Sequence, residues 1–273
     1  MKTKSALSYF GSDSEVSKEL ASFFDHCKHV SIPFVGGASI IPHLSGKIVA
    51  SDLNDAAINF YQVAKGVRGP DEQTALFDRC ANTLSHPAEL TEAAAKIDSS
   101  VEHERAWAYW AACWIPRKGN GGTRRQEVAI KGLKSKPSIR RTANGGNNAD
   151  RLVTVATDLV SWADHFKRCE FSVGCFREEM PKYADRPENG VYIDSPWYEA
   201  GDRYLHNFED IDHVDLEQLA RRFKLATVVI RYGDHPWIRD IYAGDHWKIE
   251  LKDSRTQANV RKPELWISNI RGQ

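Results

Sequence analysis

Two short apolar runs near the N-terminus each end at residues typical of turns. Val30–Val35 is followed by Gly36 and Gly37, and Lys47–Ala50 is followed by a polar stretch from Ser51 to Asn54. Short apolar runs closed by turn residues are typical of buried strands in a parallel sheet. The second run predicts a helix directly after it, with Asn54 as the N-cap.

The pattern then becomes helical from about Tyr61 to Trp114, where strand-like runs are absent. Residues 115 to 150 are rich in Gly, Asn, Lys and Arg and contain few apolar positions, which predicts a long basic loop or hairpin. The helical spacing returns over Arg151–Phe166. The aromatic residues at 107, 109, 110 and 114 are expected to belong to a helix core rather than to a base-stacking platform.

The second half alternates strands with helices. The predicted helix covers His213–Phe223. The predicted strands cover Glu170–Val173, Val191–Ile193, Leu225–Arg231, Trp247–Leu251 and Leu265–Ile270. This rhythm predicts an α/β fold with a doubly wound parallel sheet, interrupted by an inserted, partly helical, basic module. We expect a discontinuous domain of residues 1–60 and 151–273, with 61–150 as the insert.

The formal net charge is zero, yet the charge is segregated along the chain. Only Glu127 and Asp150 oppose the basic residues between Arg117 and Arg151, which gives this segment a local charge of +8. Such a run is often a solvated face, but it is also the electrostatic pattern of a polyanion-binding segment. The ten basic residues are Arg117, Lys118, Arg124, Arg125, Lys131, Lys134, Lys136, Arg140, Arg141 and Arg151.

Composition points to an ordinary globular protein of the cytoplasm. The hydrophobic fraction is 41% and the charged fraction 27%, and no apolar run approaches the length of a membrane helix. The five cysteines form no C-x-x-C pair, so we expect small buried thiols rather than disulfides or a zinc knuckle. No histidine spacing matches a metal motif, and no metal site is predicted.

The glycine turn after the first run is the first candidate site. A turn at the carboxyl end of a first strand lets a ligand approach the backbone. Asp52 closes the next strand, where an acid can accept hydrogen bonds from both hydroxyls of a ribose. A plain tight turn and a helix cap are the competing interpretations of Gly36-Gly37 and Asp52.

The second candidate site is the run from Val191 to Tyr198, where an apolar strand ends in Asp194-Ser195-Pro196-Trp197. An amine on an aromatic base is a poor nucleophile, because its lone pair is delocalised into the ring. A carboxylate and a backbone carbonyl that accept both of its N–H bonds would orient it, and an adjacent ring would hold the base by stacking. The alternative is a turn whose aromatics belong to the core.

The order of these motifs resembles that of the Dam-like (D12 class) DNA adenine-N6 methyltransferases, and the resemblance spans nearly the whole chain. In that family a Phe-x-Gly cofactor motif comes first, an acid ends the second strand, and a DNA-recognition insert precedes an Asp-Pro-Pro-Tyr motif. The matching segments here are Tyr9-Phe10-Gly11, Phe34-Val35-Gly36, Asp52, Asp194-Ser195-Pro196-Trp197, Val228–Tyr232, Ile238–Tyr242 and Glu264–Asn269.

The resemblance implies a Rossmann-like S-adenosylmethionine-dependent methyltransferase sheet and assigns roles to residues. Asp194 and the Ser195 carbonyl would hold the target amine, beside Pro196, and Trp197 would stack on a flipped base. The implied S-adenosyl-L-methionine pocket consists of Tyr9, Gly11, Phe34, Gly36, Gly37, Asp52, Cys175 and Phe176. The implied DNA contacts are Arg117, Lys118, Arg124, Arg125, Lys131, Lys134, Arg140 and Arg141.

The expected activity is therefore methylation of adenine N6 in DNA. The expected partner is DNA, and a separate restriction endonuclease is an optional second partner. The expected assembly is a monomer or a dimer. Ser195 and Trp197 replace the family's usual Pro and Tyr, which leaves the target base open. The alternatives are a cytosine-N4 methyltransferase, transfer of another group to a base amine, and a DNA-binding descendant without turnover.

Overall fold

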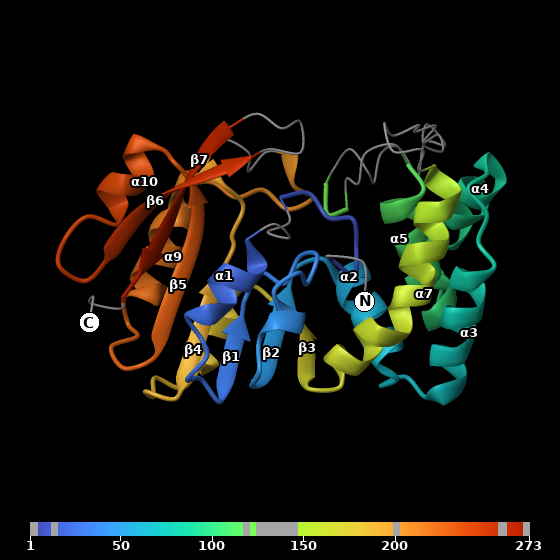
Figure 1. Cartoon of the computed structure of the whole chain (residues 1–273), viewed down its shortest axis with the longest axis horizontal. Coiled ribbons are helices and arrows are strands. Elements are labelled where there is room, and N and C mark those ends of the chain that lie inside the picture. Colours follow the sequence, from blue (N-terminus) through green and yellow to red (C-terminus); the bar gives the residue numbers. More distant parts are fainter. Residues whose placement is uncertain are drawn as a thin grey trace.

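Seven strands form a single sheet in the part of the chain that the structure describes (Figure 1). The computed structural model describes residues 5–11, 16–116, 121–123, 147–198, 203–255 and 261–269. The strand order is β3-β2-β1-β4-β5-β7-β6, and the pairs from β3 to β5 are parallel, which confirms a mostly parallel α/β sheet of Rossmann-like type. The strands are β1 His29–Ile32, β2 Lys47–Asp52, β3 Cys169–Val173, β4 Asn189–Ile193, β5 Thr227–Gly233, β6 Lys248–Arg255 and β7 Arg261–Ser268.

The last strand corrects the expectation of a wholly parallel sheet. β7 is antiparallel to both β5 and β6, between which it lies. Only residues 256–260 separate β6 from β7. A parallel crossover needs a dozen or more residues, so a connection this short forces the chain to reverse direction as a hairpin.

The helices begin and end at residues suited to those positions. Asn54 caps α2 as predicted, since its side chain accepts a hydrogen bond from the backbone N–H of Ala57, and left-handed Gly66 ends the helix. None of the described helices is long and apolar enough to cross a membrane. The helices are α1 Ser17–Ser22, α2 Asp55–Lys65, α3 Pro70–Ala81, α4 Pro87–Lys96, α5 Glu102–Trp114, α7 Asn148–Phe166, α8 Phe176–Glu179, α9 Asp210–Ala220 and α10 Pro236–Ile241, with short 3-10 turns η1 Ile41–His43 and η2 Met180–Lys182.

The sheet separates two hydrophobic cores, because alternate residues of a strand point to opposite faces. In β5, Val229 belongs to the core that includes buried residues of α1, α2, α5 and α7. Its neighbours Val228 and Ile230 pack in the core beneath α8, α9 and α10. The same alternation holds in β4 and β7. Helices therefore cover both faces, as expected for a doubly wound sheet.

The predicted helical insert consists of α3, α4 and α5, which lie with α7 to one side of the sheet (Figure 1). Trp107, Tyr109, Trp110 and Trp114 of α5 are buried, which confirms that they belong to a helix core. This core is continuous with the one on the sheet. The expected boundary at residue 60 falls inside α2, which continues to Lys65 because its helical stop signal comes only at Gly66.

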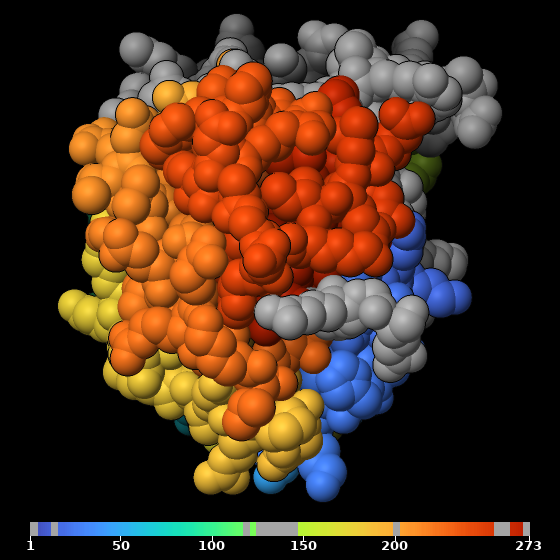
Figure 2. Space-filling view, turned by 90° about the vertical axis from the view of Figure 1, so that its left-hand side faces the viewer, coloured from blue at the N-terminus to red at the C-terminus, as the bar shows by residue number. Residues whose placement is uncertain are grey.

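The N-terminal helix α1 lies against the β6–β7 hairpin, which Figure 2 shows as a blue segment beside the red one. Phe23 packs edge-on against Trp266, and Lys252 bonds to Glu19, 233 positions away in the sequence. Segments from near the two ends of the described chain therefore pack against each other.

Candidate active site

Three of the predicted site segments meet at the carboxyl edge of the sheet. Phe34 follows β1, Asp52 ends β2, and Asp194 follows β4. Because β1, β2 and β4 are parallel, their carboxyl ends lie at the same edge. The chain order reverses between β1 and β4, and such a switch point opens a crevice in which ligands of α/β proteins bind.

A hollow with about 590 Å³ of open space lies at this point, and a second one of about 620 Å³ adjoins it. They share Tyr9, Phe34, Asp52, Pro196 and Tyr204 in their walls. The predicted site residues that line the first hollow are Tyr9, Gly11, Phe34, Gly36, Gly37, Asp52, Asp194 and Pro196. Cys175 and Phe176 line the second. Ser195 and Trp197 line neither one.

The carboxylate of Asp52 is held by the backbone on both sides. Its Oδ2 accepts a hydrogen bond from the N–H of Gly36, and its Oδ1 from the N–H of Asn54, each at 3.0 Å. Gly36 adopts φ 46°, a left-handed conformation that glycine accepts without strain. The helix cap is Asn54 itself, so Asp52 joins the two turns rather than capping α2.

The ionised form of Asp52 is destabilised by its position in the wall of the hollows. Burial raises the pKa of its carboxyl above the ordinary value, although the N–H groups of Asn54 and Gly36 oppose this. A buried carboxylate gains most from further hydrogen-bond donors that enter the hollow.

A polar network supports the glycine turn from behind. The side-chain amide of Asn54 donates to the hydroxyl oxygens of Tyr9, at 3.2 Å, and Tyr109, at 2.7 Å. The hydroxyl of Tyr61 donates to the carbonyl of Gly36. Tyr9 is therefore a buried wall residue that is bonded to the first residues of α2.

Asp194 lies beside a buried arginine. Nη1 of Arg231, in β5, is 3.3 Å from Oδ2 of Asp194, and Nη2 is 2.8 Å from Oε2 of Glu264, in β7. Glu264 also accepts a hydrogen bond from the indole of Trp266. Sequence reasoning included Arg231 and Glu264 only as members of matching segments. The available signal was a charged residue within the β-branched strand β5.

The aromatic residue of the second motif rests on β5. The guanidinium carbon of Arg231 lies over the ring of Trp197, 5.0 Å from the ring centroid. A Cβ on Gly233 would come within 2.7 Å of this ring, so glycine permits the close contact. Ser195 is buried between Asp194 and Pro196. Trp197 is half-buried, and its predicted stacking on a base stays a prediction.

Three phenylalanines form an apolar wall in the second hollow. The ring centroids of Phe34, Phe176 and Phe208 are 5.4 to 5.8 Å apart in every pairing. Sequence reasoning missed Phe208 and also Tyr204, which lines both hollows. Both follow the second motif along the chain as aromatic positions in an otherwise polar stretch, and that was the only local signal.

One end of the basic segment reaches the rim of the hollows. Gly121 pairs with Tyr9, Thr123 pairs with Tyr204, and Gly122 lines the second hollow. Arg151 packs on Trp114 from α7. The predicted DNA contacts Arg117, Lys118, Arg124, Arg125, Lys131, Lys134, Arg140 and Arg141 lie outside the described residues.

Within the described ranges, no group of three or more His, Cys, Asp or Glu side chains could hold a metal ion. Four of the five cysteines are buried and Cys175 is half-buried, and none of them is in a disulfide.

Comparison with known proteins does not identify a family. No family model matches the chain, and no curated protein is significantly similar to it. Among solved structures, cofactor-bound Rv0187 from MTB overlays on 94% of this chain and 81% of its own, with 11% sequence identity and a TM-score of 0.39. A likeness this weak carries no inference about function.

Proposed function

We propose that the protein is an S-adenosylmethionine-dependent methyltransferase that acts on an exocyclic base amine in DNA, with adenine N6 as the first candidate. The observation that carries this proposal is the position of Asp52 and Asp194 in the wall of one hollow at the switch point of the sheet. One acid suits a ribose, and the other suits an amine that is to be methylated.

The walls of the two hollows fit the cofactor. Asp52 would accept hydrogen bonds from the ribose hydroxyls, since a carboxylate has about four acceptor positions and the backbone N–H groups of Gly36, Asn54 and Leu53 do not take all of them. Phe34, Phe176 and Phe208 would pack on the adenine. Around Asp194, two carboxylates face one guanidinium, and the resulting negative charge favours a sulfonium cation.

The topology and the glycine turn differ from those of the dinucleotide-binding class. The sheet differs from the dinucleotide-binding order 3-2-1-4-5-6 by an antiparallel strand inserted between β5 and β6. Residues 36–39 are Gly-Gly-Ala-Ser, which lacks the G-x-G-x-x-G spacing of dinucleotide-binding turns.

In this proposal the protein's own groups orient the nucleophile. The Asp194 carboxylate and the Ser195 carbonyl accept the two N–H bonds of the amine and direct its lone pair toward the cofactor. When bound, S-adenosylmethionine would supply a methyl group on a sulfonium whose sulfur keeps the bond electrons. The surplus proton on the methylated nitrogen would pass to solvent.

DNA is the proposed substrate because described residues of the basic segment lie at the site. Gly121 and Thr123 pair with Tyr9 and Tyr204, and Gly122 lines the second hollow. A segment with a local charge of +8 suits a phosphate backbone.

The test is nucleoside mass spectrometry of DNA from cells that express the protein. We expect N6-methyladenine above the background of a methylation-deficient host. N4-methylcytosine would move the target to cytosine, and unmodified DNA together with cofactor binding would favour a DNA-binding protein without turnover.

A matched pair of variants links the signal to the site. Asp194→Ala should lower the transfer rate at least ~10²-fold, by analogy with loss of one oxyanion-hole donor, while cofactor affinity is retained. Asp240→Ala, which removes an exposed acid in α10, should leave the rate unchanged. Wild-type activity in folded Asp194→Ala would remove Asp194 from the mechanism.

A further inference from the structure

Arg231 is a charged side chain placed deep in the protein, with 6% of its surface exposed. Its guanidinium touches three separate segments: the Gly11 carbonyl at 3.4 Å, the Asp194 carboxylate after β4, and Glu264 on β7. Trp197 packs against it as well. A buried ion of this kind costs several kcal/mol to desolvate, so apolar residues would serve stability alone at least as well.

We propose that Arg231, held by Glu264, is a positioning residue that sets the orientation and the ionisation of Asp194 in the reaction. This inference rests on the proposed function for its activity readout. Its structural part rests only on the contacts of Arg231 with Asp194 and Glu264.

Arg231 can orient Asp194 because of the shape of its guanidinium group. Its planar fork presents donors in fixed directions, so one side chain bonds Asp194 and Glu264 simultaneously. Glu264 is fully buried and is itself fixed by the indole N–H of Trp266. The Asp194 carboxylate is therefore tied through Arg231 to the antiparallel strand β7, and not only to its own turn.

The ionisation of Asp194 depends on the groups that face its carboxyl. Arg231 contributes a cation from β5, while Asp52 lies across the hollow and Tyr204, Tyr192 and Tyr232 surround the pair. Burial would lower the pKa of Arg231, but the carboxylates of Asp194 and Glu264 outweigh it and raise that pKa. Arg231 therefore stays charged and favours the ionised form of Asp194, in which both carboxylate oxygens accept hydrogen bonds.

The test removes the charges of Arg231 and Glu264 together. Arg231→Met alone would leave Glu264 buried and unpaired, so the main variant is Arg231→Met with Glu264→Gln, in which Trp266 keeps an acceptor. The matched control is Arg221→Met with Glu217→Gln. Glu217 likewise binds an arginine and the indole of a tryptophan, Trp247, but it does so away from the hollows.

The first readout is the pH at which the ¹³C-labelled Asp194 carboxyl titrates, assigned with Asp194→Asn. It should move to higher pH in the Arg231/Glu264 double variant and stay in place in the control pair. An unmoved titration in the folded double variant would overturn the proposal. Because this readout needs no turnover, it remains informative even if the proposed methyl transfer fails.

The second readout is the rate constant for methyl transfer to unmodified DNA. In the double variant kcat should fall on the order of 10²-fold, and the acid limb of its pH profile should move to higher pH. Arg231→Lys serves where the double variant does not fold: it keeps the charge and loses the fork, so the titration should stay while kcat falls. Wild-type kcat in Arg231→Lys would contradict the orienting role.

Discussion

Asp52 shows how one side chain serves both the fold and the site. Its two oxygens join the turn after β1 to the start of α2 through Gly36 and Asn54. The same carboxylate lines both hollows. Because burial raises its pKa, its charge is sensitive to pH nearer to neutrality than that of an exposed aspartate.

We predict that Asp52→Asn weakens S-adenosylmethionine binding about 10- to 150-fold, which corresponds to the loss of roughly 1.5–3 kcal/mol from a charge-assisted interaction. Ribose hydroxyls donate to the ionised form, so wild-type affinity should decline as pH falls through the raised pKa of Asp52. The variant should lose this pH dependence. Titration calorimetry from neutral pH down to the acid limit of the folded state measures both effects.

Asp240→Asn is the control for that experiment, because Asp240 is exposed on α10. It should retain both the affinity and the pH dependence. Unchanged affinity in folded Asp52→Asn would leave Asp52 with only its role in joining the two turns.

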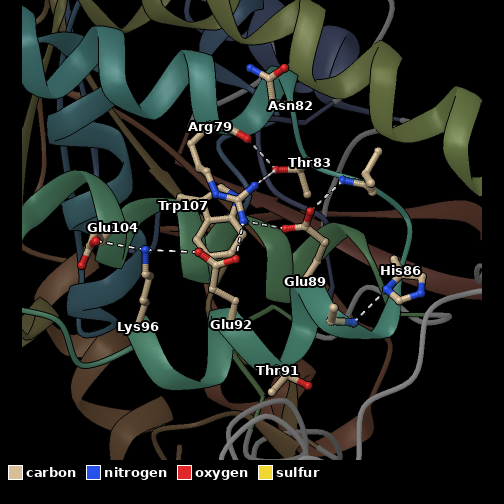
Figure 3. Close-up of polar contacts among 12 residues, drawn as sticks. Arg79, Asn82, Thr83, His86, Glu89, Thr91, Glu92, Lys96, Glu104 and Trp107 are labelled. Carbon is tan, nitrogen blue, oxygen red and sulfur yellow. Dashed lines mark hydrogen bonds and ion pairs between the residues drawn. The ribbon is translucent and has the colours of Figure 1, made fainter.

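At the scale of elements, a charged cluster joins α3, α4 and α5 (Figure 3). Arg79 of α3 bonds to Glu89 at 2.7 Å and to Glu92 at 2.8 Å, both on α4. Its guanidinium also lies 3.8 Å from the ring centroid of Trp107, in α5. One side chain therefore contacts all three helices, in addition to their apolar packing through Leu76, Leu90 and Trp107.

We predict that Arg79→Met lowers the free energy of unfolding by about 1–2 kcal/mol. The variant removes two charge-assisted bonds and a cation–π interaction, each weakened by partial exposure of the cluster. Chemical denaturation measures the change. Lys167→Met breaks the exposed pair with Asp164 and should leave the free energy of unfolding nearly unchanged. Equal effects of the two substitutions would refute the idea that Arg79 holds the three helices together.

At the scale of the whole molecule, the hollows lie on the carboxyl side of the sheet, and Gly121–Thr123 of the basic segment lie beside them. Strands β1, β2 and β5 begin at the opposite edge, where exposed cations also occur. The two sides therefore offer a comparison between a proposed DNA-binding surface and an ordinary charged one.

We predict that replacing Arg124, Arg125, Arg140 and Arg141 with Ala weakens binding to DNA of any sequence and leaves cofactor binding unchanged. The slope of log affinity against log salt should become shallower by about 0.9 for each phosphate that the variant no longer neutralises. The control replaces Lys28, Lys47, Arg222 and Lys224, which are exposed at the opposite edge. Equal slopes in the two fourfold variants would show that the basic segment is only a solvated surface.

The sequence by itself determined the elements and the candidate residues. Apolar runs closed by turn residues located the strands of the sheet and the helix after β2, because hydrophobic periodicity and capping are local properties. Resemblance in motif order then selected Asp52 and Asp194, which the structure brings into one hollow.

The tertiary structure decided how those elements meet. The place of β7 beside β5, the packing of Trp197 on Gly233 and the pairing of Arg231 with Glu264 all depend on which strands become neighbours. Strands β4, β5 and β7, which bring these residues together, are separated in the sequence by other elements, so no local pattern contains that information. The partner of Asp194 therefore became visible only when β5 was placed between β4 and β7.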